Sequence, residues 1–543
     1  MENRRDQIFP VLSQDQIATA RRFASAPPRR HEPGATMASV GERGVPAFLI
    51  LDGQIEIHRR GAGGQHGIVT VHGPGHITGE VSQLAGRAAL VDVKAGPEGC
   101  EALSFCPAHL RALIVGSAEI GEMVMRAFIL RRVSLIEEGV GSVLLGAHND
   151  PALLRIESFM AQNGHPYSTV DAYHGEEGRE MIERLGLADE DLPLLLCANG
   201  SVLKRPTIAE VGACLGVIPE LHPDKLYDVA VIGAGPAGLA TAVYAASEGL
   251  SVLVLDERGF GGQAGASSRI ENYLGFPTGI SGRALAGRAF TQAQKFGAEV
   301  AIPVSVEKLD CGGGEGQPLI LSVSGGKTIR ARTVVIASGA RYRKLPVADL
   351  ELFEGGGISY WASPVEAKLC AGAEIALVGA GNSAGQAVVF LAPKVRKLHL
   401  IVRGPSLDAS MSRYLIDRIA QLPNVVTHFH AEVASLQGDA AKGLEGIEIM
   451  DKVTSAISAE PIRHLFLFIG AEPNAHWLDG CPVALDPHGF ILTGDAAGRS
   501  LSLETSIPGV FAIGDVRSGS TKRVAAAVGE GAQVVSALHG LLA

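Results

Sequence analysis

The sequence predicts a multidomain chain: a small β-barrel or jelly roll at the front, a compact α/β unit behind it, and two larger α/β units in the second half. Short alternating strands separated by glycine-rich turns fill the first 140 residues, which is typical of a barrel. Two apolar segments in the second half each run into a glycine-rich turn and a helix. The chain has 543 residues, 46% of them hydrophobic, and is long enough for about three or four domains.

The barrel is expected over residues 1–140. Its strands are predicted over residues 47–51, 54–58 and 67–71, with turns between them, and its helices over 107–114 and 120–138. Strands of this length with alternating polarity have one buried face, so a closed or two-layered sheet is expected.

A charged motif lies within this part of the chain. Gly79-Glu80 and Arg87-Ala88-Ala89 resemble the phosphate-binding cassette of cyclic nucleotide-binding domains, and residues 51–55 resemble the glycine turn of that fold. The resemblance implies that Glu80 holds the ribose and that Arg87 pairs with the cyclic phosphate, which suits a forked guanidinium. The stretch from Glu80 to Arg87 is shorter than in the family, so a barrel that keeps its fold without a ligand is the alternative.

Residues 141–222 resemble a thioredoxin-type unit. The predicted order is strand, helix, strand, helix, hairpin, helix. Leu192-Pro193 resembles the cis-proline of that fold, and cis peptide bonds are nearly always X-Pro. The dithiol of that family is missing, because the first strand runs into Gly146-Ala147-His148-Asn149-Asp150. Cys197 is expected to be a buried strand residue.

The first glycine-rich turn carries the signals of a dinucleotide site on a Rossmann-like unit. A buried parallel strand is predicted over residues 228–232, a helix over 239–248 and a second strand over 251–255. The glycines permit a tight turn, a close approach of a pyrophosphate and close packing of the helix, and an acid ends the second strand where a ribose hydroxyl is expected. The residues expected at this site are Gly233, Gly235, Pro236, Ala237, Gly238 and Asp256.

The second glycine-rich turn follows a strand predicted over residues 374–378 and indicates a second Rossmann-like unit. Its own second strand, residues 397–402, ends in Arg403 rather than in an acid. An arginine there suits a 2′-phosphate better than a free hydroxyl, so NADPH is expected rather than NADH. Arg413 lies nearby in sequence and is interpreted as a solvated surface residue. The residues expected at this site are Gly379, Gly381, Asn382, Ser383, Ala384 and Arg403.

A third motif stands near the C-terminus, where a short strand over residues 510–513 leads to Gly514-Asp515. With the three motifs in this order, residues 226–543 resemble the thioredoxin reductase family, a small flavoprotein with an FAD subdomain and an inserted NADPH subdomain. The resemblance implies that residues 223–342 and 471–543 form the FAD subdomain and residues 343–470 the NADPH subdomain. It also implies FAD contacts from Gln263, Asn272, Ala337, Gly339, Gly514, Asp515, Arg523 and Val524.

The chain lacks the dithiol of that family. Where a thioredoxin reductase carries a Cys-x-x-Cys pair, this chain reads Tyr360-Trp361-Ala362-Ser363-Pro364. The seven cysteines form neither such a pair nor a zinc-like cluster with histidine, so we expect no metal site and mainly structural thiols. Cys370 is interpreted as a half-buried thiol before a strand, with a displaced redox cysteine as the alternative.

Charge and hydropathy exclude some classes of function. The net charge of −10 argues against nucleic-acid binding, which would show a basic domain. No segment approaches the roughly 18 apolar residues of a membrane span, and no hydrophobic leader follows the first residues. A cytoplasmic protein is therefore expected.

These observations predict an NADPH-dependent FAD oxidoreductase. Its electrons would pass to an external acceptor: a thioredoxin-like disulfide, a ferredoxin-type carrier, a quinone or a small oxidant. Hydride transfer is the chemistry of the cofactors, and no catalytic acid, base or nucleophile stands out. Regulation by a cyclic nucleotide and a homodimeric state are also expected. The alternative is a non-catalytic sensor in which flavin state and cyclic nucleotide occupancy are coupled.

Overall fold

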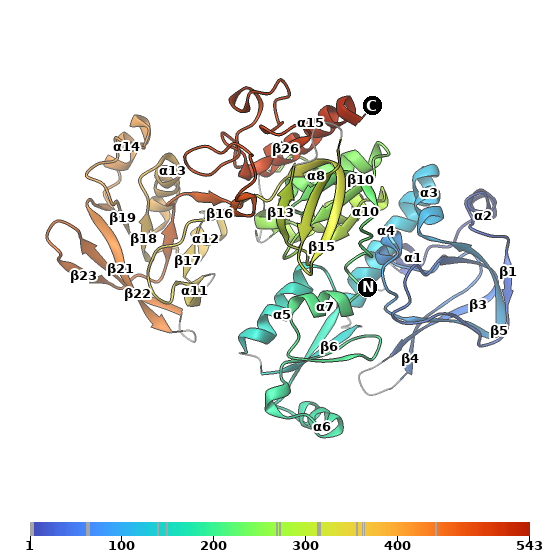
Figure 1. Cartoon of the computed structure of the whole chain (residues 1–543). Helices are drawn as coiled ribbons and strands as arrows, with labels where there is room; N and C mark the ends of the chain where they lie inside the picture. The colour runs from blue at the N-terminus through green and yellow to red at the C-terminus, as the bar shows by residue number, and fades with distance from the viewer. Residues whose placement is uncertain are drawn as a thin grey trace. The chain divides into compact units, whose positions relative to one another are not determined.

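A computed structural model gives the fold and describes residues 5–542 except 61–65, 138–140, 148–149, 266, 268–269, 271–272, 312–316, 355–356, 361, 363 and 440–442. The chain divides into two compact units, one made of Met1–Gly339 with Ala475–Ala543 and the other of Ala340–Asn474. Their helices and strands are labelled in Figure 1. Among the described residues, no helix is both long and apolar enough to cross a membrane.

The front of the first unit is a five-stranded antiparallel sheet with helices packed on it. The elements are α1 (Arg5–Ile8), α2 (Gln14–Arg21), β1 (Arg29–His31), β2 (Thr36–Ala38), β3 (Ala47–Arg60), β4 (His66–His72), β5 (Asp92–Phe105), α3 (Pro107–Gly116) and α4 (Ala118–Glu137). The strand order is β1-β5-β3-β4, with β2 beside β5. Leu49 and Phe105 of the sheet pack against Leu110 of α3 and Phe128 of α4 in one buried core.

The prediction of separate strands on either side of residue 53 was wrong. β3 is continuous through this point, and its pairing with β5 shifts register on both sides of Gly53. Gly53 has a φ of +74°, and a Cβ there would lie 2.2 Å from the carbonyl oxygen of Gly99. The glycine therefore makes a bulge inside one long strand instead of a turn between two.

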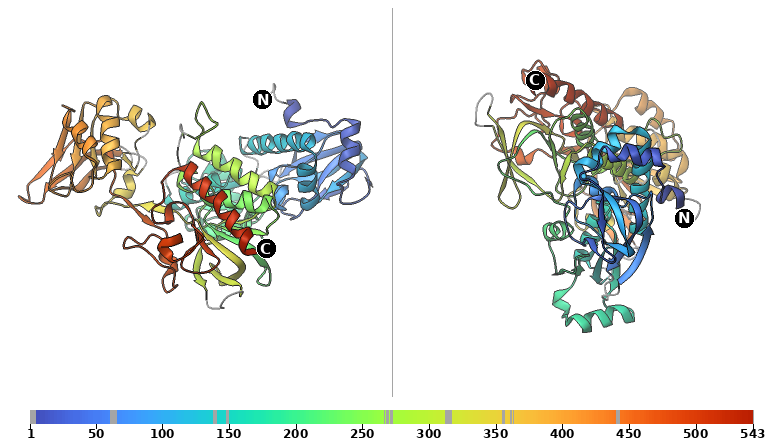
Figure 2. Two further views of the ribbon diagram at one scale, coloured as in Figure 1. Left: turned by 90° about the horizontal axis from the view of Figure 1, so that it is seen from above. Right: turned by 90° about the vertical axis from the view of Figure 1, so that its right-hand side faces the viewer.

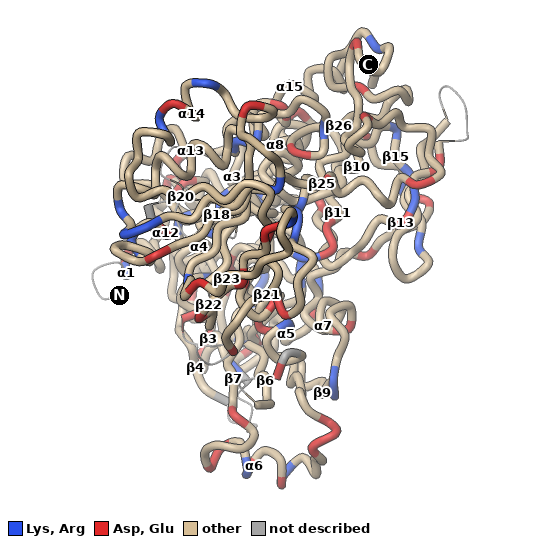
Figure 3. The backbone as a smooth tube through the Cα atoms, turned by 90° about the vertical axis from the view of Figure 1, so that its left-hand side faces the viewer, with Lys and Arg blue, Asp and Glu red and all other residues tan. Residues whose placement is uncertain are grey.

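The next part of the first unit is a four-stranded sheet in the order β7-β6-β8-β9. Its elements are β6 (Ser142–Gly146), α5 (Pro151–Gln162), β7 (Tyr167–Asp171), α6 (Glu176–Leu185), β8 (Leu194–Leu196), β9 (Val202–Lys204) and α7 (Ile208–Cys214). β6 and β7 are parallel, and β8 and β9 form an antiparallel hairpin on the other side of β6. The Leu192–Pro193 bond is cis. Helix α6 contains four glutamates and two arginines, whose positions along the backbone are red and blue in Figure 3.

The largest sheet of the first unit has seven strands in the order β12-β11-β10-β15-β14-β13, with β26 beside β15. Its elements are β10 (Leu226–Ile232), α8 (Pro236–Ser247), β11 (Val252–Leu255), α9 (Gly262–Gly265), α10 (Gly282–Lys295), β12 (Glu299–Ala301), β13 (Val306–Asp310), β14 (Leu319–Val323), β15 (Lys327–Ile336), β26 (Val510–Ala512) and α15 (Val524–Leu542). β10, β11, β12, β15 and β26 run parallel, which confirms the buried parallel strand predicted over residues 228–232.

Helix α15 packs on α8 beside this sheet, as the views in Figure 2 show. A Cβ at Gly531 of α15 would lie 2.7 Å from the carbonyl oxygen of Ala237 and 2.7 Å from the Cβ of Ala240. Only glycine permits this approach of the two helices. Val534, Val535 and Leu538 complete the contact in a shared buried core.

The second unit contains a parallel five-stranded sheet in the order β17-β24-β18-β19-β20. Its elements are β16 (Ala340–Tyr342), α11 (Leu350–Phe353), β17 (Ile358–Ser359), α12 (Pro364–Leu369), β18 (Glu374–Val378), α13 (Asn382–Leu391), β19 (Lys397–Ile401), α14 (Arg413–Ala420), β20 (Val425–His428), β21 (Ala431–Asp439), β22 (Gly443–Asp451), β23 (Ile457–Glu460), β24 (Leu465–Leu467) and β25 (Ala471–Pro473). Leu398 and Leu400 pack on α13 and α14, whereas Ile401 packs on β21 and β22.

Candidate functional site

Three neighbouring strands of the seven-stranded sheet end at the same level. Ile232 of β10 is paired with Ile336 of β15, and Ile336 is paired with Ala512 of β26. Because the strands are parallel, the loops that follow them meet at one edge of the sheet. Ligands of open α/β sheets bind in the crevice at such carboxyl ends. This register brings the turn at Gly233, the return at Ala337 and the Gly514-Asp515 turn together.

The first glycine-rich turn has the shape that a pyrophosphate requires. Gly233 has a φ of +108°, and a Cβ there would lie 2.3 Å from the carbonyl oxygen of Ala337. A Cβ at Gly238 would lie 1.9 Å from the carbonyl oxygen of Gly233, so α8 begins directly against the turn. Gly235 precedes Pro236 and Ala237 at the start of α8, and its added Cβ would have Gly262 at 3.9 Å as its nearest neighbour. The space in front of the free amides of the helix is therefore open.

Asp256 fixes the chain around this turn. One carboxylate oxygen accepts the amide hydrogen of Ala234 at 2.8 Å, and the other accepts those of Arg258 at 2.9 Å and Gly259 at 3.0 Å. Burial raises the pKa of this carboxyl, against the lowering effect of the three amides. A carboxylate has about four lone-pair sites, so Asp256 retains capacity for a ribose hydroxyl.

The Gly514-Asp515 turn is held by a residue that no sequence motif indicated. Glu530 of α15 accepts the amide hydrogen of Gly514 at 2.6 Å and pairs with Arg517 at 2.6 Å. A Cβ at Gly514 would lie 3.2 Å from the Cβ of Ala237, so the turn sits against the start of α8. Burial raises the pKa of Asp515.

The remaining residues expected to contact FAD are distributed around this edge. Gln263 lies exposed in the short helix α9, and Gly339 has a φ of +69° just beyond β15. Arg523 is exposed immediately before α15, and Val524 is its first residue. Asn272 lies outside the described residues.

The second glycine-rich turn lies in the second unit, at the end of β18. Gly379 has a φ of +149°, and a Cβ there would lie 2.6 Å from the carbonyl oxygen of Phe468. Gly381 precedes α13, and an added Cβ would contact no atom within 4 Å. Asn382 accepts the amide hydrogen of Ser412 at 2.7 Å, which ties the turn to the loop before α14. Ser383 is exposed, whereas Ala384 is fully buried.

The two arginines near this turn have different surroundings. Arg403 is exposed just after β19 and forms no ion pair with another described residue. Arg413 is paired with Asp408 at 3.5 Å and with Asp417 at 3.0 Å. The guanidinium of Arg403 is therefore the one whose charge is available to a phosphate.

The stretch that replaces the family dithiol is only partly described, since Trp361 and Ser363 lie outside the described residues. The hydroxyl of Tyr360 donates a hydrogen bond to Glu354 at 2.5 Å. The ring of Tyr360 stacks on that of Tyr342, with centroids 5.5 Å apart. Burial and Glu354 raise the pKa of Tyr360. Cys370 is completely buried rather than half-buried, because it closes α12 against the sheet core.

Glu80 and Arg87 belong to one charged cluster in the first unit. Glu80 precedes the 3₁₀ turn Val81–Ala85 and pairs with Arg132 of α4 at 3.6 Å. The guanidinium of Arg87 lies over the ring of Phe290 on α10, 5.1 Å from its centroid. Burial first, and then Arg132, lower the pKa of Arg87 to about 10. Arg87 of the motif thus contacts helix α10 through Phe290, a contact that the sequence did not predict.

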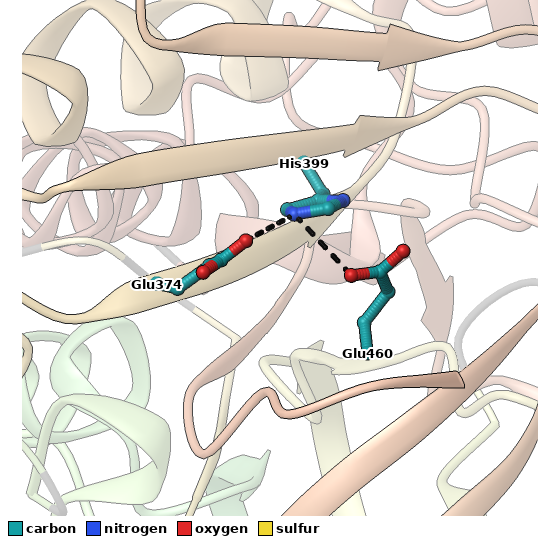
Figure 4. A group of neighbouring side chains, drawn as sticks. All are labelled: Glu374, His399 and Glu460. Atoms are coloured by element: carbon teal, nitrogen blue, oxygen red, sulfur yellow. Dashed lines mark hydrogen bonds and ion pairs between the residues drawn. The ribbon is translucent and has the colours of Figure 1, made fainter. Parts of the chain in front are cut away.

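Figure 4 shows a second polar cluster, in the second unit. In the described part of the chain, Glu374, His399 and Glu460 form the one group of acids and histidines whose ligand atoms lie within 4.8 Å of one another. Glu374 is already paired with Lys397 at 3.1 Å and Arg396 at 3.1 Å, and it accepts a hydrogen bond from His399 at 2.9 Å. Two cations balance the two carboxylates, so we interpret the cluster as an ion-pair network.

The expectation of mainly structural thiols did not include a disulfide. Cys197 is buried as expected, but it lies just after β8 and forms a disulfide with Cys214 at the end of α7. Their separation of 17 residues matches no short motif, so the sequence carried no signal for the pair. The other five cysteines are free: Cys100, Cys106, Cys311, Cys370 and Cys481.

Comparisons with known proteins find two family matches and several similar proteins. Residues 227–531 match the family model of pyridine nucleotide-disulphide oxidoreductases, and residues 28–116 match the cyclic nucleotide-binding domain. The F component of the alkyl hydroperoxide reductase of Escherichia coli (strain K12) is 32% identical over 335 residues, which cover 61% of this chain and 62% of that protein. Thioredoxin reductase of Listeria monocytogenes serovar 1/2a is 32% identical over 313 residues, 57% of this chain and 91% of that protein. The solved thioredoxin reductase of Streptococcus pyogenes MGAS5005 is 30% identical, covers 58% of this chain and 98% of its own, and aligns with a TM-score of 0.48.

The fold and the two glycine-rich turns define an NAD(P)H-dependent flavoprotein oxidoreductase with FAD and NADPH as its cofactors. The chain belongs to the pyridine nucleotide-disulphide oxidoreductase family. A cyclic nucleotide-binding domain precedes this part. The chain spans 62% of the length of the Escherichia coli hydroperoxide reductase component, so the activity of that protein as a whole does not transfer by similarity alone.

Proposed function

We propose that this chain takes electrons from NADPH and delivers them through FAD to an external disulfide acceptor of the thioredoxin class. The open space in front of Gly235 and Gly381 fits a pyrophosphate at each turn. When bound, FAD supplies a ring that accepts hydride and NADPH supplies the hydride. The chain's own residues would bind and orient these groups: Asp256 and Asp515 would bind ribose and ribityl hydroxyls, and Arg403 the 2′-phosphate.

The proposal of an external acceptor rests on the sequence of the second unit at the position where the family carries its dithiol. Residues 360–364 contain no cysteine, and no two cysteines of the chain stand three positions apart. An internal dithiol relay of the family type is therefore missing, and the electrons must leave the flavin for another molecule. The relatives named above act, by their names, on thioredoxin or serve hydroperoxide reduction, which favours a disulfide over a ferredoxin-type carrier or a quinone.

We further propose that residues 141–222 are a thioredoxin-like unit and that a cyclic nucleotide binds Glu80 and Arg87. The sheet order β7-β6-β8-β9, with two parallel strands and an antiparallel hairpin, supports the first proposal. The shared cluster of Glu80, Arg87 and Arg132 supports the second. We also propose that the chain forms a homodimer.

Anaerobic NADPH oxidation with a panel of acceptors tests this function. Fast turnover is expected with a thioredoxin disulfide and slow turnover with a ferredoxin or a quinone. Fast turnover only with another acceptor would reassign the substrate. Slow turnover with all of them, in protein that binds FAD, would instead favour the sensor in which flavin state and nucleotide occupancy are coupled.

A further inference from the structure

Cys197 and Cys214 form a disulfide in a chain whose other cysteines are free. It joins the residue after β8 to the last residue of α7, with Cα atoms 6.5 Å apart. Five other cysteines remain thiols, although Cys311 and Cys481 have their sulfur atoms only 3.4 Å apart. In a reducing compartment, where most cysteines stay free, a disulfide is usually transient and catalytic or redox-sensing.

The disulfide borders a cavity that joins two parts of the first unit. Cys214 lines this small cavity of about 20 Å³ together with Ser142, His165 and the segment Ala88–Leu90, which directly follows Arg87. Cys197 is buried, whereas Cys214 is partly accessible. A thiolate can therefore reach the sulfur of Cys214 more easily than that of Cys197.

Two polar atoms in this cavity lack hydrogen-bond partners. The Oγ of Ser142 and the Nε2 of His165 are buried and unpaired among the described residues. Burial, Arg132 and Arg87 lower the pKa of His165 well below its usual range. The cavity beside Cys214 therefore contains two buried polar atoms without a hydrogen-bond partner.

The two segments that the disulfide joins contact the barrel at Gly41, Arg43 and Ala88. A Cβ at Gly41 would lie 3.1 Å from the Cβ of Asn199, which follows Cys197. A Cβ at Gly216, just after Cys214, would lie 2.8 Å from the Cβ of Ala88. Arg43 donates a hydrogen bond to the carbonyl oxygen of Ile218 at 3.0 Å. Each contact depends on the position of a segment that Cys197 or Cys214 anchors.

We propose that Cys197 and Cys214 form a redox-active disulfide whose reduction by an external protein dithiol loosens the packing of the barrel segments 40–43 and 88–90. The site differs from the FAD and NADPH sites and concerns neither cofactor. Any effect on cyclic nucleotide affinity rests on the function proposed above.

The thiol–disulfide exchange needs no reactant other than the external dithiol. A thiolate of the external dithiol attacks the sulfur of Cys214, the bond to Cys197 breaks, and Cys197 leaves as a thiolate that takes a proton. The second thiol of the dithiol then attacks the mixed disulfide and releases Cys214 as a thiol. The external dithiol is oxidised to a disulfide, and this chain gains two electrons and two protons.

The full chain can be equilibrated in glutathione buffers of increasing reduction, as a probe of the redox equilibrium, with thiols trapped and mapped by peptide mass. We expect the Cys197–Cys214 disulfide to open within the cellular range of ratios, whereas a structural disulfide resists the glutathione pool. Hydrogen exchange of residues 40–43 and 216–218 should then quicken by about tenfold or more. A disulfide that stays closed throughout, or one that opens with unchanged exchange, would overturn the proposal.

Two further experiments identify the reductant and show which cysteine pair is responsible. Reduced thioredoxin should open the disulfide of the wild-type chain, whereas NADPH alone should leave it closed; opening by NADPH alone would overturn the external route. The Cys197→Ser/Cys214→Ser chain should show the fast exchange in every buffer. The matched Cys311→Ser/Cys481→Ser chain, which removes the other close pair of sulfur atoms, should behave as the wild type.

Discussion

The guanidinium of Arg87 lies over the aromatic ring of Phe290, 5.1 Å from the ring centroid. The cassette arginine of the barrel therefore contacts helix α10 of the seven-stranded part. Phe290 in turn stacks on Phe260, with centroids 4.3 Å apart. Phe260 directly precedes Gly261 and Gly262, and Gly262 is the nearest neighbour of the turn at Gly235. A line of contacts thus runs from the cassette to the FAD turn.

A cyclic phosphate would compete with Phe290 for Arg87. A cation over an aromatic ring contributes about 0.5–2 kcal/mol, and this contact would be lost if Arg87 turned to a ligand. Phe290→Leu should therefore tighten the binding of cyclic AMP or cyclic GMP by that amount, measured by calorimetry. Arg87→Ala should abolish binding and leave the FAD content unchanged.

The same variants test the coupling to turnover. A cyclic nucleotide should change the NADPH oxidation rate of the wild type, with a coupling free energy of about 1–3 kcal/mol between the two sites. Phe290→Leu should bind the nucleotide but weaken this effect. Phe390→Leu, which removes the ring beneath Lys394 in the second unit, is the matched control and should retain it. Binding without any rate change in the wild type would refute the coupling.

Arg403 should set the preference for NADPH. Its charge is exposed and unpaired among the described residues, whereas Asp408 and Asp417 neutralise Arg413. Arg403→Ala should weaken NADPH binding by about 1.5–3 kcal/mol, the value of a hydrogen bond to a charged group, and raise its KM. The KM for NADH should stay nearly unchanged. Arg413→Ala is the control, and a larger effect there than at Arg403 would move the phosphate to the other arginine.

The two glycine-rich turns should be separable by mutation. Gly235 and Gly381 each face open space at the start of a helix. Gly235→Val should fill the space for the FAD pyrophosphate and give colourless protein. Gly381→Val should retain the yellow flavin but lose reduction by NADPH, measured by anaerobic bleaching of the flavin absorbance. Flavin retention in Gly235→Val would place FAD elsewhere.

Local motifs explain why much of this site was predictable from the sequence. The strand, glycine turn and helix around Gly233 form one continuous segment, and each glycine acts on neighbours close in sequence. The same holds for Gly379 and for residues 142–214, where the strands and helices follow one another in the predicted order. The bulge at Gly53 was mistaken for a turn because both features place glycine between two apolar runs.

Contacts between distant segments were not predictable. Glu530 holds the amide of Gly514 from a helix whose sequence reads as plain apolar packing. Phe290 meets Arg87 across about 200 residues of chain, and Cys197 pairs with Cys214 without a motif. Such pairs depend on how whole sheets and helices pack together. No motif of fixed spacing marks them, so they cannot be predicted from one sequence.

Glu374 should make the second unit sensitive to acid. The hydrogen bond from buried His399, followed by Lys397, lowers the pKa of this carboxyl from its ordinary 4.5 to about 2. A lowered pKa stabilises the fold above the unfolded value and loses this contribution as the pH falls through the folded value. Hydrogen exchange of β18 in the wild type should therefore quicken between about pH 4.5 and pH 2 beyond the intrinsic trend.

Glu374→Gln should remove this dependence. At pH 7 the variant should lower the local free energy of opening by about 1–2 kcal/mol, because one charge-assisted hydrogen bond to a buried ring is weakened. The difference from the wild type should vanish near pH 2. Glu432→Gln breaks the exposed pair with Lys452, at 3.1 Å in the same unit, and should cost less than about 0.5 kcal/mol. Equal effects of the two variants would show that the Glu374 cluster is no more than a surface ion pair.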